Sequence, residues 1–164
     1  MRSVKCRAFI ILTTLSVFIC GCSTDKYKDD VSCQMLAQTA AEQLPAELDL
    51  RELDASFRDF YFGDAKGYDD CFVMHSAENE DISEIGVFHS ADDESAADVE
   101  NVCREYIADL QQNSRAFIAS YAPKELTKLD DGEVRRYGRY VVYTVLDGAD
   151  AEKVFEAVHH ALEE

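Results

Sequence analysis

Hydrophobic side chains recur at helical spacing along four stretches of the chain, and the longest of these covers Asp92–Tyr121. This stretch predicts one long amphipathic helix, for which Ser90 and Asp93 have the spacing of a capping box. A helix of roughly 29 residues would measure about 43 Å, which is more than the width of a domain of this size. We therefore expect a bend near Asn113 and Ser114.

Three shorter stretches predict further helices. The first covers Cys33–Leu44, with either Asp30 or Ser32 as its N-terminal cap. The second covers Leu50–Tyr61, and the last begins near Asp150. Two of these helices therefore precede all of the strands predicted below.

Four short segments rich in aromatic and β-branched residues predict β-strands. The first two, "DCFVMH" and "SEIGVFHS", are joined by the loop Ser76–Ser83, which is longer than the loops of most hairpins. The other two lie within "EVRRYGRYVVYTVL" on either side of Gly138 and Arg139, which are typical of a glycine-first hairpin turn. The expected fold is α+β, with antiparallel strands in two hairpins in the order ββαββα, helices packed on the sheet, and the N-terminal helices in front.

An apolar run, Ala8–Cys20, follows Arg2, Lys5 and Arg7 near the N-terminus. A basic stretch followed by a short apolar one is typical of a secretory signal peptide. As a helix the run would reach roughly 20 Å, short of the ~30 Å hydrocarbon core that a membrane-spanning helix has to cross. We therefore expect the run to be removed rather than to remain as a membrane anchor.

The residues that close this run, Ile19, Cys20, Gly21 and Cys22, resemble the lipobox of bacterial lipoproteins. In a lipobox the cysteine thiol receives a diacylglycerol and a peptidase cleaves just before the modified residue, which would make Cys22 the lipidated N-terminus. Cys20 is a poorer candidate, because the bulky Ile19 precedes it where the peptidase requires a small residue. The alternative is an ordinary secreted protein that is cleaved nearby.

Two acyl chains hold a protein stably on a membrane. We therefore expect a protein of the cell membrane, lipid-anchored through Cys22 on the extracytoplasmic face. The expected organisation is a lipoprotein signal peptide over residues 1–21, a lipidated linker over 22–30 and a single α+β domain over 31–164. The polar linker should hold the domain off the membrane.

The chain is strongly acidic, with 33 Asp and Glu residues, 16 Lys and Arg residues and a formal net charge of −17. Removing residues 1–21 would take away three basic residues and no acidic one. This charge argues against nucleic-acid binding, which depends on Lys and Arg side chains that neutralise phosphates. It also predicts repulsion from anionic headgroups, although solubility alone is a sufficient reason for the acidity.

Three cysteines follow Cys22, namely Cys33, Cys71 and Cys103, and they have neither CxxC nor metal-ligand spacing. An odd number of cysteines permits at most one internal disulfide and leaves one thiol over. Each of the three lies on the apolar face of a predicted element. Buried free thiols that pack as small hydrophobic side chains are therefore the simpler interpretation.

The histidines lack the spacing of a metal site. If the first two strands pair, His75 lies near Ser83 or Glu84, and His89 lies about 17 Å further along at ~3.4 Å per residue. The two histidines of the last helix are consecutive, whereas zinc-binding helices place two histidines four residues apart. The sequence contains neither a GxSxG motif nor a phosphate-binding glycine loop. We therefore predict no cofactor, no metal and no catalytic residue.

Four acidic side chains in and after the first hairpin loop are weak candidates for a cation site: Glu78, Glu80, Asp81 and Glu84. They could offer oxygen ligands to calcium, yet the loop lacks the alternating acidic ladder, the central glycine and the distal glutamate of an EF-hand. Solvated acidic loops without a ligand are the commoner case. The same carboxylates would form the site of an enzyme, because a desolvated carboxyl paired with an ionised one can divide the acid and base roles.

Several basic side chains stand out in this acidic domain: Arg135, Arg136 and Arg139 at the second hairpin, with Lys124 and Lys128 before it. Such a patch is a candidate contact for an acidic partner or headgroup. Ion pairs with neighbouring acids of the same domain are the simpler alternative.

Three features link the chain to a known family: the strand start at Glu84 and Ile85, the corner Tyr121–Leu126, and the "GxYVVYxV" hairpin over Gly138–Val145. These features resemble the bacterial lipoprotein group catalogued as domain-of-unknown-function family 4358 (DUF4358), and the resemblance covers roughly Phe57–Val158. The resemblance implies a small exported or surface lipoprotein and supplies no catalytic residue.

We therefore expect a lipid-anchored, non-enzymatic binding or accessory module of the cell envelope, whose partner is another envelope protein or a small ligand. A cell-envelope enzyme with a paired-carboxylate site and a structural surface protein are the alternatives. A deep pocket with a buried carboxylate would favour the enzyme, whereas an exposed apolar patch would favour a binding partner.

Overall fold

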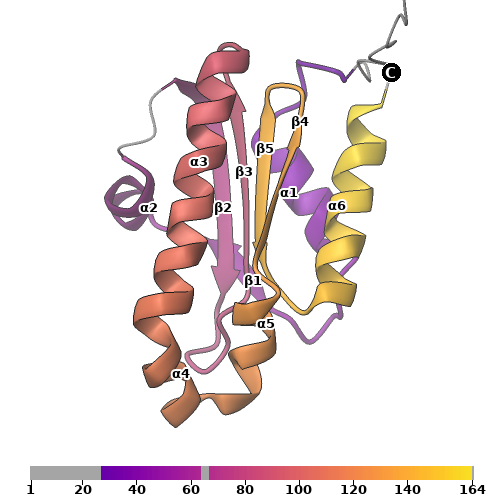
Figure 1. Ribbon diagram of the computed structural model, residues 1–164. Coiled ribbons are helices and arrows are strands. Elements are labelled where there is room, and N and C mark those ends of the chain that lie inside the picture. The colour runs from indigo at the N-terminus through magenta and orange to yellow at the C-terminus, as the bar shows by residue number, and fades with distance from the viewer. Residues whose placement is uncertain (1–26, 64–66, 164) are drawn as a thin grey trace, which may run out of the picture.

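The centre of the molecule is a five-stranded sheet in which every pair of neighbouring strands is antiparallel (Figure 1). In this computed structural model, which describes residues 27–63 and 67–163, the strand order is β1-β2-β3-β5-β4. The strands are β1 (Leu50–Glu52), β2 (Tyr68–Ser76), β3 (Glu84–Ser90), β4 (Glu133–Tyr137) and β5 (Tyr140–Val145). The prediction of an α+β fold with an antiparallel sheet is confirmed.

Helices cover both faces of the sheet (Figure 1). The helices on one face are α1 (Cys33–Ala41) and α6 (Gly148–Leu162), and those on the other are α2 (Ala55–Phe62) and α3 (Asp93–Asp109). At one end of the sheet, α3 continues through a π-helical turn, Leu110–Ser114, into α4 (Arg115–Tyr121). A 3₁₀ turn, Pro123–Glu125, and α5 (Leu126–Asp130) lead back to β4.

The core has two layers because the central strands are covered on both sides. Every residue of β5 is buried. Val142 faces α1 and α6, whereas Val141, Tyr143 and Val145 face α3. A strand that is buried on both faces reads as a continuous apolar run, as "YVVYTV" does.

The helix predicted over Leu50–Tyr61 is wrong in its first part. Leu50–Glu52 form the edge strand β1, which pairs with β2, and α2 begins only at Ala55. The Asp54 side chain accepts a hydrogen bond from the Ser56 backbone N–H and so caps α2. Leu50 packs in the core layer beside α1, and helical spacing in the sequence did not distinguish that position from a helical one.

The start of α3 also differs from the prediction. Asp92 is the cap, because its side chain accepts a hydrogen bond from the Ser95 backbone N–H at 2.8 Å. Ser90, which was expected to take part in a capping box, is the buried last residue of β3. The bend expected near Asn113 and Ser114 coincides with the π-helical turn, a feature that commonly interrupts long helices.

Other local features agree with the predictions made from the sequence. Ser32 caps α1, since its side chain accepts a hydrogen bond from the Met35 backbone N–H. Gly138 has a φ of +58° at the turn between β4 and β5, a left-handed conformation that favours glycine. His75 pairs with Glu84 across β2 and β3, which is one of the two positions expected for it.

The segment before α1 packs against one end of the sheet. Tyr27 forms a β-bridge with Glu163, and its ring lies against those of Tyr137 and His159. Asp29 accepts a hydrogen bond from Arg139 at 2.8 Å. Residues 27–30, which were assigned to the linker, therefore contact the domain directly.

The predicted signal peptide (1–21) and the predicted lipidation site, Cys22, lie outside the described residues. Within the described part of the chain, every helix is too short or too polar to span a bilayer.

Candidate functional site

A cavity of about 620 Å³ opens beneath α2 at one end of the sheet. Residues of β1, α2, β2, β3 and α3 line it, among them Arg51, Phe57, Tyr61, His75, Glu84 and Tyr106. Its lining thus combines aromatic and aliphatic side chains with five ionisable ones: Arg51, Glu52, Asp54, His75 and Glu84. Apolar walls with convergent polar groups are typical of a small-ligand site.

Three of these ionisable side chains come from three neighbouring strands. Arg51 of β1 pairs with His75 of β2, and His75 pairs with Glu84 of β3. Residues that are directly opposite in an antiparallel sheet point to the same face. The strand register therefore places Arg51, His75 and Glu84 in one row on the face that α2 and α3 cover.

Glu84 is held by two tyrosine hydroxyl groups. Tyr106 of α3 donates its hydroxyl to the carboxylate, at 2.8 Å from Oε2 and 3.0 Å from Oε1. Tyr143 of β5 donates to Oε2 at 3.1 Å. Burial raises the pKa of the Glu84 carboxyl above its ordinary value, and the two hydroxyl groups only partly oppose this effect.

Gly86 makes this arrangement possible. It lies directly opposite Tyr143 in the pairing of β3 with β5, and the tyrosine ring occupies the space that a side chain at position 86 would fill. A Cβ atom at Gly86 would lie 2.0 Å from Cε1 of Tyr143. Sequence reasoning missed this site, although a glycine inside a strand, two residues after Glu84, is a signal of close approach.

The Glu84→Gln variant tests the raised pKa. Between the ordinary value of 4.5 and the raised value, the folded protein binds the Glu84 proton and the unfolded chain does not. The free energy of unfolding therefore falls as pH rises through this window, and glutamine removes this contribution. We expect the free energy of unfolding of the wild type minus that of the variant, measured by urea denaturation, to decrease as pH rises above 4.5.

Glu80→Gln, at an exposed loop residue, is the control and should follow the wild-type profile. The raised pKa of Glu84 would be contradicted if the free energy of unfolding of the wild type minus that of Glu84→Gln stayed constant or increased with pH.

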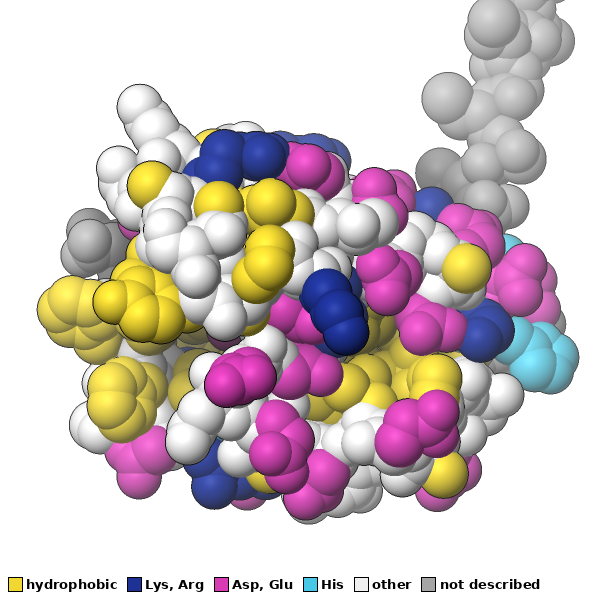
Figure 2. All heavy atoms as spheres, turned by 90° about the horizontal axis from the view of Figure 1, so that it is seen from below, with side chains coloured by type: hydrophobic (Ala, Val, Ile, Leu, Met, Phe, Trp, Pro, Cys, Tyr) yellow, Lys and Arg dark blue, Asp and Glu magenta, His cyan; other side chains and the backbone are white. Residues whose placement is uncertain are grey.

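Exposed aromatic side chains of α2 lie at one side of the cavity. Phe57 and Tyr61 of α2 are 57% and 44% exposed although they line it, and Phe60 beside them is 80% exposed. The Tyr61 ring packs against that of Tyr106, with 5.3 Å between centroids. Figure 2 shows hydrophobic side chains gathered at the left of this view, the side on which α2 and α4 lie in Figure 1. We call Phe57, Phe60 and Tyr61 the aromatic rim.

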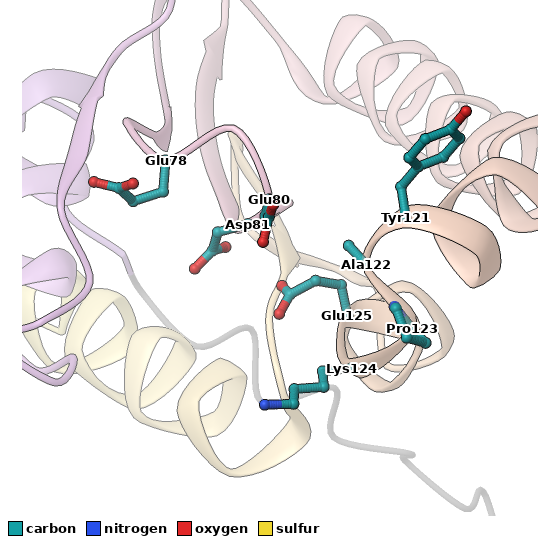
Figure 3. A pocket seen from close by; sticks show the side chains of 8 residues that line it. All are labelled: Glu78, Glu80, Asp81, Tyr121, Ala122, Pro123, Lys124 and Glu125. Carbon is teal, nitrogen blue, oxygen red and sulfur yellow. The ribbon is translucent and has the colours of Figure 1, made fainter.

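The acidic loop lies at a different cavity, of about 390 Å³, which Glu78, Glu80, Asp81 and Glu125 help to line (Figure 3). Glu78 points away from Asp81 and Glu125 (Figure 3). The Lys128 ammonium group lies between Asp81 and Glu125, at 3.0 and 2.8 Å. A cation of the protein itself thus occupies the position at which these two carboxylates would bind a metal ion.

The structure separates the four acidic candidates. Glu84 lines the cavity beneath α2, whereas Glu78, Glu80 and Asp81 line the other one. Within residues 27–63 and 67–163, no three potential ligand side chains are grouped as a metal site requires.

The three arginines of the second hairpin are engaged within the domain. Arg135 pairs with Glu133 and Glu152 at 2.7 and 2.6 Å. Arg136 pairs with Asp93 at 2.9 Å, and Arg139 pairs with Asp29.

The cysteines of the described residues are free thiols. Cys33 and Cys103 are buried and Cys71 is half-buried. Burial raises the pKa of each thiol, so the thiolate form, which is the reactive one, is disfavoured.

The fold and the cavity together define an α+β domain with an antiparallel sheet, helices on both faces and one aromatic-rimmed cavity beneath α2. Residues 46–146 match the family model described as "Domain of unknown function (DUF4358)", so the chain belongs to this family. No curated protein and no solved structure matches the chain.

Proposed function

We propose that the protein is a lipid-anchored module on the extracytoplasmic face of the cell membrane, where it binds another envelope component at the aromatic-rimmed cavity. The lipobox-like residues that end in Cys22 support the anchor. The cavity beneath α2 supports the binding role, because it combines apolar walls with a few convergent polar groups.

The aromatic rim is the observation that carries the binding role. Phe57, Phe60 and Tyr61 are neighbours on one short helix, and each leaves a large part of its ring in solvent. Burying such a side chain contributes roughly 1.5–3 kcal/mol, so a partner that covers the rim gains much of its affinity there. Clustered exposed aromatic side chains are typical of a binding surface.

An enzyme with paired carboxylates is the alternative, and the buried Glu84 is the observation in its favour. Two further carboxylates, those of Glu52 and Asp54, also line the cavity. Glu52 pairs with Met74, which packs in the core layer on the other face of the sheet. The Asp54 carboxylate, however, already accepts two hydrogen bonds from Ser56 at the start of α2. The geometry therefore supports binding better than acid–base catalysis by a carboxylate pair.

The lipid anchor is tested by intact mass spectrometry of the protein extracted from its own membrane. We expect a chain that begins at Cys22 and carries a diacylglyceryl group. Cys22→Ser should abolish the incorporation of labelled fatty acid, whereas the matched variant Cys20→Ser should retain it. An unmodified Cys22, or a mature chain that still begins at Met1, would refute the anchor.

The binding role is tested by photo-crosslinking in native membranes. The photoreactive residue p-benzoylphenylalanine would replace Phe57 in the aromatic rim or Met35 on α1, which is on the opposite face of the sheet. The two positions are a matched pair, because Phe57 is 57% exposed and Met35 is 54% exposed. We expect a discrete crosslinked product from position 57 and none from position 35. Equal crosslinking at both positions, or none at either, would refute a binding site at the rim.

A further inference from the structure

We infer that the ligand group which enters the cavity is an ammonium group carried on an apolar body, an inference that rests on the binding function proposed above. Glu84 supplies the carboxylate that would pair with the ammonium group, aromatic side chains form part of the cavity wall, and the strand register sets the distance from Glu84 to Arg51.

The carboxylate of Glu84 has only neutral partners among the described residues. Its oxygen atoms accept hydrogen bonds from the hydroxyl groups of Tyr106 and Tyr143. Neutral donors satisfy the lone pairs but leave the negative charge of the ionised carboxylate uncompensated in a partly desolvated site. A ligand ammonium group would supply both a charge of opposite sign and further hydrogen-bond donors.

The aromatic walls of the cavity also favour an ammonium group on an apolar body. The rings of Phe57, Tyr61 and Tyr106 line the space above Glu84. Aromatic faces attract cations through their quadrupole, and they also pack against an apolar body. An anionic ligand would gain nothing from these faces and would be repelled by Glu84.

Neither Arg51 nor His75 supplies the positive charge that the Glu84 carboxylate lacks. The register puts Arg51 two strands away from Glu84, about 10 Å at ~4.8 Å per strand. Arg51 is exposed, so its repulsion of an ammonium group beside Glu84 is screened by solvent. Burial and the charge of Arg51 lower the pKa of His75, which therefore stays uncharged at neutral pH. Both His75 and Glu84 line the cavity, and the hydrogen bonds of the Glu84 carboxylate go to Tyr106 and Tyr143 rather than to His75.

The test uses the full chain, extracted from membranes into detergent micelles and labelled for NMR titration. Three probes share one aromatic body: 2-phenylethylamine, 2-phenylethanol and phenylacetate. We expect the amine to shift the resonances of Tyr61, His75 and Glu84, and to bind roughly tenfold more tightly than the alcohol. Phenylacetate should bind more weakly than either.

The variant Glu84→Gln should weaken amine binding roughly tenfold and leave alcohol binding unchanged, because glutamine keeps the shape but not the charge. The control Glu80→Gln lies at the other cavity and should bind the amine as the wild type does. Wild-type protein that binds the alcohol or phenylacetate as tightly as the amine would overturn the inference, even if Glu84→Gln did not fold. Failure of all three probes would also overturn it, and crosslinking from position 57 would then still support the binding function.

Discussion

The Phe62→Ala variant is expected to lose about 3–5 kcal/mol of its free energy of unfolding. Phe62 is fully buried, and its ring centroid lies 4.9 to 5.5 Å from those of Phe88, Tyr106 and Tyr143. Alanine would leave a cavity among these rings that the surrounding structure fills only in part. Urea denaturation followed by circular dichroism measures the loss.

The variant should also weaken the candidate site, because Phe62 is the buried residue of α2 and holds that helix on the sheet. Phe60→Ala, two residues away and 80% exposed, is the matched control, with an expected change of less than about 0.5 kcal/mol. Equal losses in the two variants would mean that α2 is not anchored by Phe62.

The Gly86→Ala variant should lose about 1–3 kcal/mol, although it adds only one methyl group. The new Cβ atom would lie 2.0 to 2.7 Å from three atoms of the Tyr143 ring, which is itself fully buried. The ring would have to move, and its hydroxyl group would leave Glu84. The smaller conformational entropy of unfolded alanine offsets about 0.4–1 kcal/mol of this cost. Urea denaturation measures the net effect.

Gly148→Ala at the start of α6 is the control, because an added Cβ atom there would meet its nearest atom, Oδ2 of Asp131, at 3.3 Å. We expect a change within about 0.5 kcal/mol. A second control combines Gly86→Ala with Tyr143→Leu. The double variant should be less destabilised than the sum of the two single variants, because leucine removes the atoms that the methyl group would meet. If the losses of the two single variants simply add in the double variant, the cost of Gly86→Ala does not come from contact with the Tyr143 ring.

The strands of the sheet could be predicted because their signals are local. Aromatic and β-branched residues fill β2, β3 and β5, and the turn at Gly138 fixes the register of β4 against β5. The sequence also placed His75 near Ser83 or Glu84, and the structure pairs it with Glu84. The edge strand β1 was missed, because only three residues form it and its partner, β2, is distant in sequence.

The candidate site could not be predicted, because its contacts connect residues that are far apart in sequence. Tyr106 and Tyr143, which donate hydrogen bonds to Glu84, are 22 and 59 residues away from it. Closeness in sequence was misleading for the acidic loop, where Glu84 follows Asp81 by three residues but lines a different cavity. Lys128, which neutralises Asp81, is 47 residues away.

The position of Tyr27 has a consequence for how the domain would be presented at a membrane. Tyr27 lies beside the Gly138 turn and the end of α6, whereas Glu84 pairs with Val145 at the far end of β5. If Cys22 carries the lipid, the segment from Cys22 to Tyr27 has five peptide units and can span at most roughly 18 Å. The turn at Gly138 would then lie close to the membrane. The cavity beneath α2 would lie at the end of the domain that is farther from the membrane.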